Sequence, residues 1–270
     1  MYESDATETS KGALVELCRA LRQYRRDIVL AGGWAPYFLT LGHFDHCGSI
    51  DIDFVLRPEI VTRYERIKEI IERLGYEPTE NVFRFEKQVV SPRTGNRHTI
   101  ELDFLTEPMG AERLPRDWLH TIQSDLKACI IEGSSIVFKH NQEIEVTATL
   151  PGDGEASANI PTADVVGSLT MKGLALHRMK DKDSYDIYAV AGYHEGSPSQ
   201  AARAFSETMG RESGIESPTT EAFREIKRAF ASTTSQGPAA VARFTGNEND
   251  RVDSHQRLKA FLEILNQENP

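Results

Sequence analysis

Cysteine is scarce in this chain, and its arrangement excludes two kinds of structure. Three cysteines occur among 270 residues, and none of them has the C-x-x-C spacing. An odd number without that spacing supports neither a disulfide framework nor a thiolate zinc site. We therefore expect a reducing, cytoplasmic location. The sequence also lacks an apolar run near the roughly 20 residues that span a bilayer, and its acidic, polar segment Met1–Lys11 does not resemble a signal peptide, so no membrane association is expected.

An excess of positive charge is also missing. The chain has 31 Lys and Arg against 41 Asp and Glu, which gives a formal net charge of −10. Such a protein is not a generic polyanion binder, and a nucleic-acid substrate would need a local basic patch. The length suffices for two compact lobes, and a hydrophobic content of 39% is ordinary for a globular protein.

Two short motifs near the N-terminus carry the chemistry. Gly32-Gly33 follow the apolar run Ile28–Leu30, where a strand would give way to a helix whose amides can approach an anion. Alone, such a pair indicates only a tight turn. In the second motif, Gly48-Ser49 precede Asp51 and Asp53, which would point to the same face of a strand. Paired carboxylates of this kind repel each other unless they bind a cation, and Mg²⁺ bridged to substrate phosphates is the expected ligand.

A third acidic position lies in the segment Thr99–Leu105, which reads as another strand. Glu101 and Asp103 share one of its faces. In metal-dependent nucleotidyl transfer, a carboxylate on a neighbouring strand completes the site and helps to deprotonate the attacking hydroxyl. We assign this role to Asp103, because Glu101 could instead pair with an arginine such as Arg84.

A charged motif in the second half of the chain would lie on two consecutive helices. Lys172 is on the first, and Lys182, Asp183 and Asp186 share one turn of the second. A lysine aimed at a triphosphate suits a metal held by carboxylates. The alternative is a solvated surface with ion pairs between residues four apart.

The order of predicted elements indicates an α/β (α+β) fold. We expect a domain over 1–150, with a small mixed sheet and flanking helices, and a mostly helical domain over 151–270. The predicted strands are 28–31, 50–56, 82–90, 98–105, 129–131, 135–139 and 143–149, and the predicted helices are 13–25, 34–41, 58–74, 165–179, 184–193, 221–231 and 251–265. The segment Pro151–Ser157 is predicted to connect the domains, with a nucleotide bound in the cleft between them.

These motifs together resemble the DNA-polymerase-β-like nucleotidyltransferase superfamily, and the helical motif from Lys172 through Arg178 to Asp186 is similar to that of its AbiEii/MenT-type toxin branch. The resemblance implies Mg²⁺, with Mn²⁺ as the alternative, bound by Asp51, Asp53 and Asp103. It also implies that the triphosphate lies near Gly32, Gly33, Gly48 and Ser49, and that Arg178 and Asp183 make further contacts with the nucleotide. Lys172 would neutralise phosphate charge. Asp186, with Asp183, would orient Lys172 or the acceptor.

The resemblance also implies a function, which is transfer of a nucleotide from an NTP to an acceptor hydroxyl. In several members the acceptor is the 3′ end of tRNA, and the enzyme is a toxin with a cognate antitoxin. Two departures leave other acceptors open. Lys182 stands where the motif usually has arginine, and Gly33-Trp34-Ala35 is similar to the aminoglycoside and lincosamide nucleotidyltransferases. The alternatives are therefore an antibiotic-modifying nucleotidyltransferase and a catalytically silent NTP-binding module.

Overall fold

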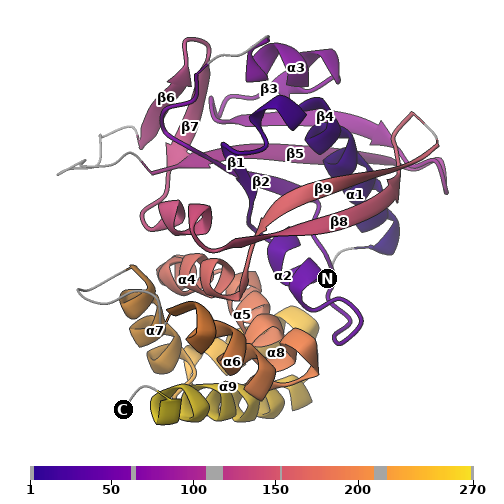
Figure 1. Cartoon of the computed structure of the whole chain (residues 1–270). Helices are drawn as coiled ribbons and strands as arrows, with labels where there is room; N and C mark the ends of the chain where they lie inside the picture. The colour runs from indigo at the N-terminus through magenta and orange to yellow at the C-terminus, as the bar shows by residue number, and fades with distance from the viewer. Residues whose placement is uncertain (1–2, 62–64, 108–117, 153, 210–217, 269–270) are drawn as a thin grey trace. The chain divides into compact units, whose positions relative to one another are not determined.

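The computed structural model of the chain describes residues 3–61, 65–107, 118–152, 154–209 and 218–268 (Figure 1). The chain forms two compact units, and each is described by itself. The sheet unit consists of Tyr2–Trp34 and Cys47–Ala163, and the helical unit consists of Ala35–His46 and Asp164–Pro270. No helix among the described residues is long and apolar enough to cross a membrane.

The described part of the sheet unit contains nine strands, two α-helices and two 3₁₀ helices. The helices are α1 (Ser4–Ala20), η1 (Arg22–Tyr24), α3 (Ile67–Arg73) and η2 (Ser134–Phe138). The strands are β1 (Ile28–Leu30), β2 (Asp51–Leu56), β3 (Glu77–Pro78), β4 (Arg84–Val90), β5 (Arg97–Thr106), β6 (Leu119–Gln123), β7 (Leu126–Ile130), β8 (Asn141–Thr149) and β9 (Glu155–Ala163).

The strands form one mixed sheet, which confirms the predicted fold class. Their order is β3-β4-β5-β2-β1-β9-β8, and β7 joins the end of β5 and carries β6. The pairs β2–β5, β1–β9 and β5–β7 are parallel, and the other pairs are antiparallel. The sheet thus places β2, with its two aspartates, directly beside β5.

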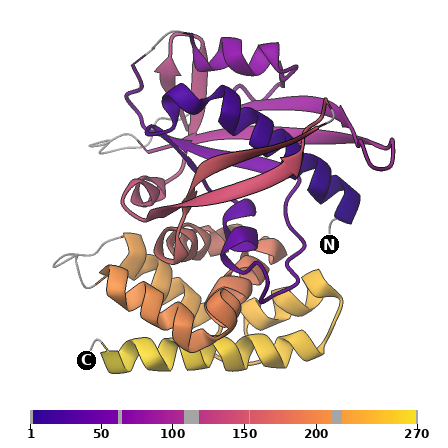
Figure 2. The same ribbon diagram turned by 45° about the vertical axis from the view of Figure 1, so that its right-hand side comes forward.

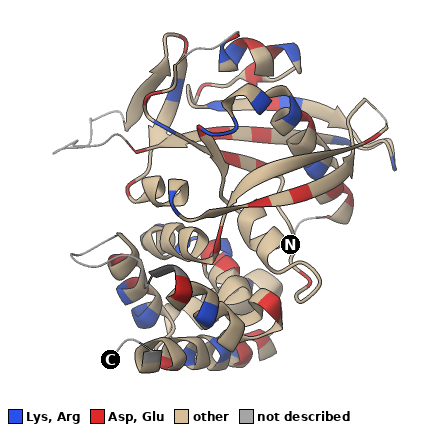
Figure 3. Ribbon diagram, in the orientation of Figure 1, with Lys and Arg blue, Asp and Glu red and all other residues tan. Residues whose placement is uncertain are grey.

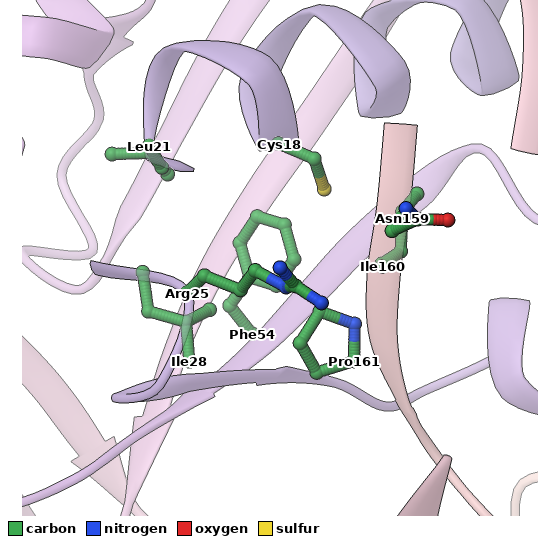
Figure 4. A pocket seen from close by; sticks show the side chains of 8 residues that line it. All are labelled: Cys18, Leu21, Arg25, Ile28, Phe54, Asn159, Ile160 and Pro161. Atoms are coloured by element: carbon green, nitrogen blue, oxygen red, sulfur yellow. The ribbon is translucent and has the colours of Figure 1, made fainter. Parts of the chain in front are cut away.

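The two faces of β2 differ because its residues alternate between apolar and acidic. Ile52 and Phe54 are 0% and 2% exposed, whereas Asp51 and Asp53 are half-buried. Helix α1 crosses the apolar face of the sheet in both views of the ribbon (Figures 1 and 2). Figure 4 shows Phe54 on this face, where it lines a small cavity together with Cys18 from α1. Burial of each such aromatic or aliphatic side chain contributes about 1.5–3 kcal/mol, so the acidic side chains are left on the opposite face.

The helical unit contains α2 (Trp34–Leu39), which begins at its border, and helices further along the chain. These are α4 (Val165–Ala175), η3 (Leu176–Arg178), α5 (Asp181–Tyr193), η4 (His194–Gly196), α6 (Pro198–Met209), α7 (Pro218–Ala229), α8 (Gln236–Thr245) and α9 (Asn249–Glu268). The Asp164 carboxylate accepts a hydrogen bond from the Gly167 amide at 2.9 Å and caps α4. Met179, at φ +55°, adopts the left-handed conformation that separates α4 and η3 from α5. The chain therefore turns back, and residues of α5 come to lie against α4.

The segment Ala35–His46 belongs to the helical unit although it lies early in the sequence. The Tyr185 hydroxyl donates to the Asp45 carbonyl at 3.5 Å, and the His194 ring is hydrogen-bonded through Nδ1 to the Leu39 carbonyl at 2.9 Å. The Phe44 ring lies 4.5 Å from that of Tyr193. These contacts hold the early segment against α5 and the turn that follows it.

Several predicted boundaries differ from the structure. The segment 151–157 does not connect domains, because β8 and β9 pair from Thr149 and Glu155 along their whole length and enclose a hairpin turn. The chain leaves the sheet unit at Ala163 instead, so the division differs from the predicted border at residue 150 and also assigns 35–46 to the helical unit. Residues 135–138 form a 3₁₀ helix and not a strand.

Other elements are shifted or were missed. The first helix occupies Ser4–Ala20, earlier than predicted. The helix expected from Pro58 begins at Ile67, and residues 62–64 of that prediction lie outside the described residues. Strands β3, β6 and β9 and helices α6 and α8 had no counterpart in the predictions. Their sequences mix small and polar residues, and the packing that selects their conformation is tertiary.

Candidate active site

Four carboxylates lie on one face of two adjacent strands in the sheet unit. In the parallel register of β2 with β5, Asp51 lies opposite Glu101 and Asp53 opposite Asp103. Paired residues on neighbouring strands share a face, so all four side chains project from the face that α1 does not cover. Burial raises the pKa of Glu101, and the charges of Asp51 and Asp103 add to this rise while the guanidinium beside it opposes it. This group of side chains, the acidic face, strongly favours a bound cation.

An arginine from the next strand binds this face. Arg84 lies opposite Asp103 in the antiparallel pairing of β4 with β5. Its Nε and Nη2 atoms donate to Oδ1 and Oδ2 of Asp103, each at 2.7 Å, and its Nη1 forms an ion pair with Glu101. The hydrogen bonds to Asp103 raise the pKa of Arg84 against the opposing effect of burial, and the charges of Asp103, Glu101 and Asp51 add to the rise. The guanidinium thus occupies both oxygens of Asp103 in a fork geometry.

The first glycine of the predicted pair lies directly against the acidic face. Gly32 has φ +62°, and a Cβ atom built on it would lie 1.7 Å from Oδ2 of Asp53. The amide of Ala31 donates to the Asp53 carbonyl at 2.9 Å. Only glycine combines this backbone conformation with this close approach. Gly33 is buried beside it, at the start of α2, so the turn between β1 and α2 is adjacent to the second aspartate of the pair.

The glycine and serine before β2 have a different environment. A Cβ atom at Gly48, which has φ +74°, would lie 2.2 Å from Cγ2 of Thr7 in α1. Ser49 is 2% exposed. Helix α1 also holds this segment through hydrogen bonds from the Thr7 hydroxyl to the Cys47 carbonyl and from the Ser10 hydroxyl to the Ile50 carbonyl, both at 3.0 Å. These contacts fix the start of β2, and the nucleotide-binding role of Gly48 and Ser49 stays a prediction.

Asp51 and Asp53 fit a divalent cation by their chemistry. They supply oxygen ligands from one face of one strand, which is the donor type that Mg²⁺ takes in proteins. Asp103 lies in register beside Asp53, but its two oxygens bind Arg84. In the part of the chain that the structure describes, no set of three His, Cys, Asp or Glu side chains is arranged to hold a metal ion. For Asp103 to act as a third ligand, the guanidinium would therefore have to move.

A second charged group lies in the helical unit, where α4 meets α5. The Lys172 ammonium lies 3.0 Å from Oδ1 of Asp183 and 2.7 Å from Oδ2 of Asp186. Arg178 lies 3.1 Å from the other oxygen of Asp183, and Lys182 lies 3.1 Å from Oδ1 of Asp186. Asp183 and Asp186 are 3% and 0% exposed. The carboxylates of this helical charge cluster are therefore buried, whereas the Arg178 side chain is 42% exposed. The alternative of a solvated surface is wrong for the two carboxylates, although Lys182 and Asp186 do form the ion pair between residues four apart that it described.

Burial and charge act in opposite directions on the members of this cluster. Burial disfavours the ammonium of Lys172, but the carboxylates of Asp186 and Asp183 outweigh it and raise the pKa of Lys172 above its ordinary value. Burial likewise opposes ionisation of Asp186, and Lys172 and Lys182 overcome it and hold the pKa of that carboxyl well below its usual range. The cluster is thus a network of full charges.

A histidine that the sequence did not assign completes this network. Nε2 of His46 lies 3.0 Å from Oδ1 of Asp186, and the ring is buried. Burial lowers the pKa of His46, the carboxylate of Asp186 opposes the decrease, and Lys182 and Lys172 add to it. The neutral imidazole donates its Nε2 hydrogen to the carboxylate. The two residues lie 140 positions apart in the sequence, so no local pattern indicates the pair.

The structure therefore gathers the predicted site residues into two groups, one in each unit. Asp51, Asp53, Asp103 and Gly32 meet in the sheet unit, and Lys172, Arg178, Asp183 and Asp186 meet in the helical unit. Their roles in metal and nucleotide binding stay predictions. Sequence reasoning gave Arg84 only as a partner of Glu101, and its stronger interaction with Asp103 follows from the register of β4 and β5.

Comparison with known proteins identifies the kind of molecule. A sequence model of the family described as nucleotidyl transferase AbiEii toxin, type IV TA system, matches residues 16–266. Among solved structures, the chain is similar to an antigenic nucleotidyltransferase-like protein from Paracoccidioides brasiliensis, with a TM-score of 0.38 and 13% identity over 94% of each chain. A search of curated proteins found no match. The family match confirms the resemblance that the motifs indicated.

Proposed function

Since this chain belongs to the AbiEii family of nucleotidyl transferase toxins of type IV toxin–antitoxin systems, it is a nucleotidyltransferase, and we propose that it transfers a nucleotide from an NTP to the 3′ end of tRNA in a Mg²⁺-dependent reaction. Membership in the family implies an NTP substrate, a divalent cation and a cognate antitoxin. The identity of the metal, the RNA acceptor and a cytoplasmic location belong to the proposal.

The observation that best supports the reaction is the acidic face beside Gly32. Asp51 and Asp53 would hold the cation, which when bound neutralises charge on the NTP phosphates. The acceptor hydroxyl attacks the α-phosphorus, a new P–O bond forms, and the bond to the departing pyrophosphate breaks. The hydroxyl proton passes to a carboxylate of this face, and Asp103 takes that role once Arg84 has released it.

In this proposal the helical charge cluster is a phosphate-binding group of the helical unit, described by itself. Lys172 neutralises a phosphate, and Asp183 and Asp186 hold its ammonium in one orientation. Because Asp186 is 0% exposed and binds three cationic or hydrogen-bonding groups, it acts on the position of Lys172 and not by direct contact with substrate.

The test is incubation of the protein with each radiolabelled NTP, Mg²⁺ and total tRNA. We expect label at the tRNA 3′ end with the wild type, none after Asp53→Asn, and unchanged transfer after Glu145→Gln, a matched removal of an exposed carboxylate on β8. Circular dichroism shows whether each variant is folded. Retained transfer in a folded Asp53→Asn variant would contradict the role of the aspartate pair.

The same assay separates the acceptors. A panel of aminoglycosides and lincosamides is added in place of tRNA. Label on one of these drugs with none on tRNA would replace the RNA acceptor by an antibiotic hydroxyl. Tight NTP binding without transfer to any acceptor would indicate a silent NTP-binding module.

A further inference from the structure

A large hollow in the sheet unit is lined by four arginines. Its volume is about 710 Å³, well above what one phosphate ion fills and within the range of ligand sites. Three of the arginines, Arg22, Arg25 and Arg26, come from the turn between α1 and β1, and the fourth, Arg57, follows β2. We call this site the arginine hollow. It also includes Phe138 at the end of η2.

Two of the four guanidinium groups of this hollow are available to a ligand. Among the residues that the structure describes, the side chains of Arg22 and Arg26 have no ion-pair or hydrogen-bond partner, and both are exposed. Arg25 forms an ion pair with Glu143 across the hollow. Arg57 lies over the Phe138 ring, 4.4 Å from its centroid, and donates from Nε to the Arg26 carbonyl at 3.3 Å.

This concentration of positive charge is local. The chain as a whole carries a net charge of −10, and Figure 3 shows acidic residues interspersed with Lys and Arg on both units. Within the hollow, four arginines face the single carboxylate of Glu143 among its lining residues. An anion approaching the sheet unit is therefore attracted here and repelled by the acidic face.

The hollow opens on the same face of the sheet as the paired aspartates. Val29 lines it and lies opposite Val55 in the antiparallel register of β1 with β2. Since alternate residues of a strand share a face, Val55 lies on the face of Asp53. Arg57 follows Asp53 by four residues, or roughly 13 Å along the strand at about 3.3 Å per residue. The cavity in Figure 4, which Cys18 lines, lies on the opposite face and shares with the hollow the residues Arg25 and Pro161.

We propose that the arginine hollow binds the sugar–phosphate backbone of the RNA acceptor, a few nucleotides upstream of its 3′ end. This inference rests on the proposed function, because it assumes that the 3′ hydroxyl reacts at the acidic face. At about 3.4 Å per stacked nucleotide, the separation between Asp53 and Arg57 corresponds to about four nucleotides. Arginine forks match phosphate oxygens, and the partly exposed Phe138 ring, with Arg57 over it, provides a surface on which a base can stack.

The size and position of the hollow favour RNA over other anions. A single phosphate would occupy a small part of it, whereas successive phosphates would reach arginines from two separate segments of chain. An acidic protein would have no reason to approach along the line that leads to the paired aspartates. An RNA strand that places its 3′ end at the aspartates and runs along β2 toward Arg57 reaches the hollow within about four stacked nucleotides.

The test compares the Arg22→Gln/Arg26→Gln double variant with a charge-matched control, Arg203→Gln/Arg228→Gln, which removes two exposed arginines of the helical unit. Affinity for fluorescent tRNA is measured by anisotropy at several salt concentrations. We expect the first variant to bind tRNA about tenfold or more weakly, with a salt slope lower by about 1.4 for two lost single-strand phosphate contacts. The control is expected to keep the wild-type affinity and slope. Because the four arginines are exposed, both variants should fold, and thermal melting checks this.

Two further measurements distinguish the possible failures. NTP affinity is expected to be equal in the wild type and in both variants, since the hollow does not contact the nucleotide. If the wild type modifies tRNA and the Arg22/Arg26 variant binds and modifies it equally well, the hollow is not an RNA site and the proposed function stands. If the wild type modifies no RNA, the proposed function fails, and weaker RNA binding by the variant alone decides whether the hollow holds RNA.

Other occupants are outcomes of the same experiment. Inorganic phosphate is titrated into the wild type and the Arg22/Arg26 variant, and phosphate binding that the variant loses while its tRNA affinity stays at the wild-type value would identify a small-anion site. If the variant keeps its RNA affinity but loses binding to the purified product of the neighbouring reading frame, the hollow is a protein interface. Either result would overturn the assignment to RNA.

Discussion

The interaction of Arg84 with Asp103 makes a quantitative prediction about metal binding. If Asp103 is a third ligand, the guanidinium competes with the cation for the same two oxygens, each 2.7 Å from a donor nitrogen. Removing the competitor by Arg84→Met must then strengthen binding of Mn²⁺, which replaces Mg²⁺ as a spectroscopic probe.

The structure sets the expected size of this effect. Two hydrogen bonds between charged groups contribute about 1.5–3 kcal/mol each at most, but the Arg84 side chain is 29% exposed and the Asp103 side chain 11%, so solvation reduces the total. A net competition of about 1–3 kcal/mol corresponds to a Kd for Mn²⁺ lowered about 5- to 150-fold. The variant without metal should also be less stable, because Asp103 would be left buried without its partner.

The assay is titration of Mn²⁺ by electron paramagnetic resonance, with Arg97→Met as the control at the exposed end of the same strand, β5. The double variant Arg84→Met/Asp103→Asn should return to the wild-type Kd or above it. If the folded Arg84→Met variant binds Mn²⁺ no more tightly than the wild type, Asp103 is not a metal ligand, and the site consists of the β2 pair alone.

Three other substitutions test the local geometry. Gly32→Ala should abolish nucleotide transfer, because the added methyl group would lie 1.7 Å from Oδ2 of Asp53. The control is Gly42→Ala, which is also at positive φ but has no atom within 4 Å of the added methyl group, and it should be active. Equal activity of the two variants would show that the contact with Asp53 is unimportant. Lys172→Met should lower the free energy of unfolding by about 3–5 kcal/mol in chemical denaturation, because it leaves two buried carboxylates short of a cation, and a loss under 1 kcal/mol would contradict this. Burial lowers the pKa of His46 in the folded state, so the unfolded state takes up a proton at this residue first as the pH falls. The free energy of unfolding should therefore decrease below about pH 6.5, by up to about 1.4 kcal/mol per pH unit. His46→Gln should remove this part of the pH dependence, and an unchanged pH profile of stability would contradict the prediction.

The features that the sequence predicted correctly are those that depend on the residues of one short segment. The alternation of Asp51, Ile52 and Asp53 defines a strand with one acidic face, and the turn-rich segment 91–96 defines the hairpin of β4 and β5. The spacing of Lys172 and Asp186 likewise placed both on consecutive helices. Each of these signals depends on periodicity within one or two elements.

The features that were missed depend on register or on contacts between distant segments. Whether Arg84 lies opposite Glu101 or Asp103 is decided by the pairing of two strands, and a shift of one residue would move the side chain to the other face. The segment 151–157 contains Pro and Gly, which are typical of a linker and of a hairpin turn alike. It is a turn because β8 pairs with β9. A local pattern in the sequence does not show that these two strands pair.

The two charged groups differ in how their charges are balanced, and this bears on what each can bind. On the acidic face, Glu86 of β4 also lies in register with Glu101, so five carboxylates share the face with the guanidinium of Arg84. Its excess of negative charge repels a triphosphate unless cations compensate it. In the helical charge cluster, the two buried carboxylates bind three cationic side chains, those of Lys172, Arg178 and Lys182. The cluster therefore has one excess positive charge and can attract a phosphate without a metal ion, whereas the acidic face needs a metal ion to do so.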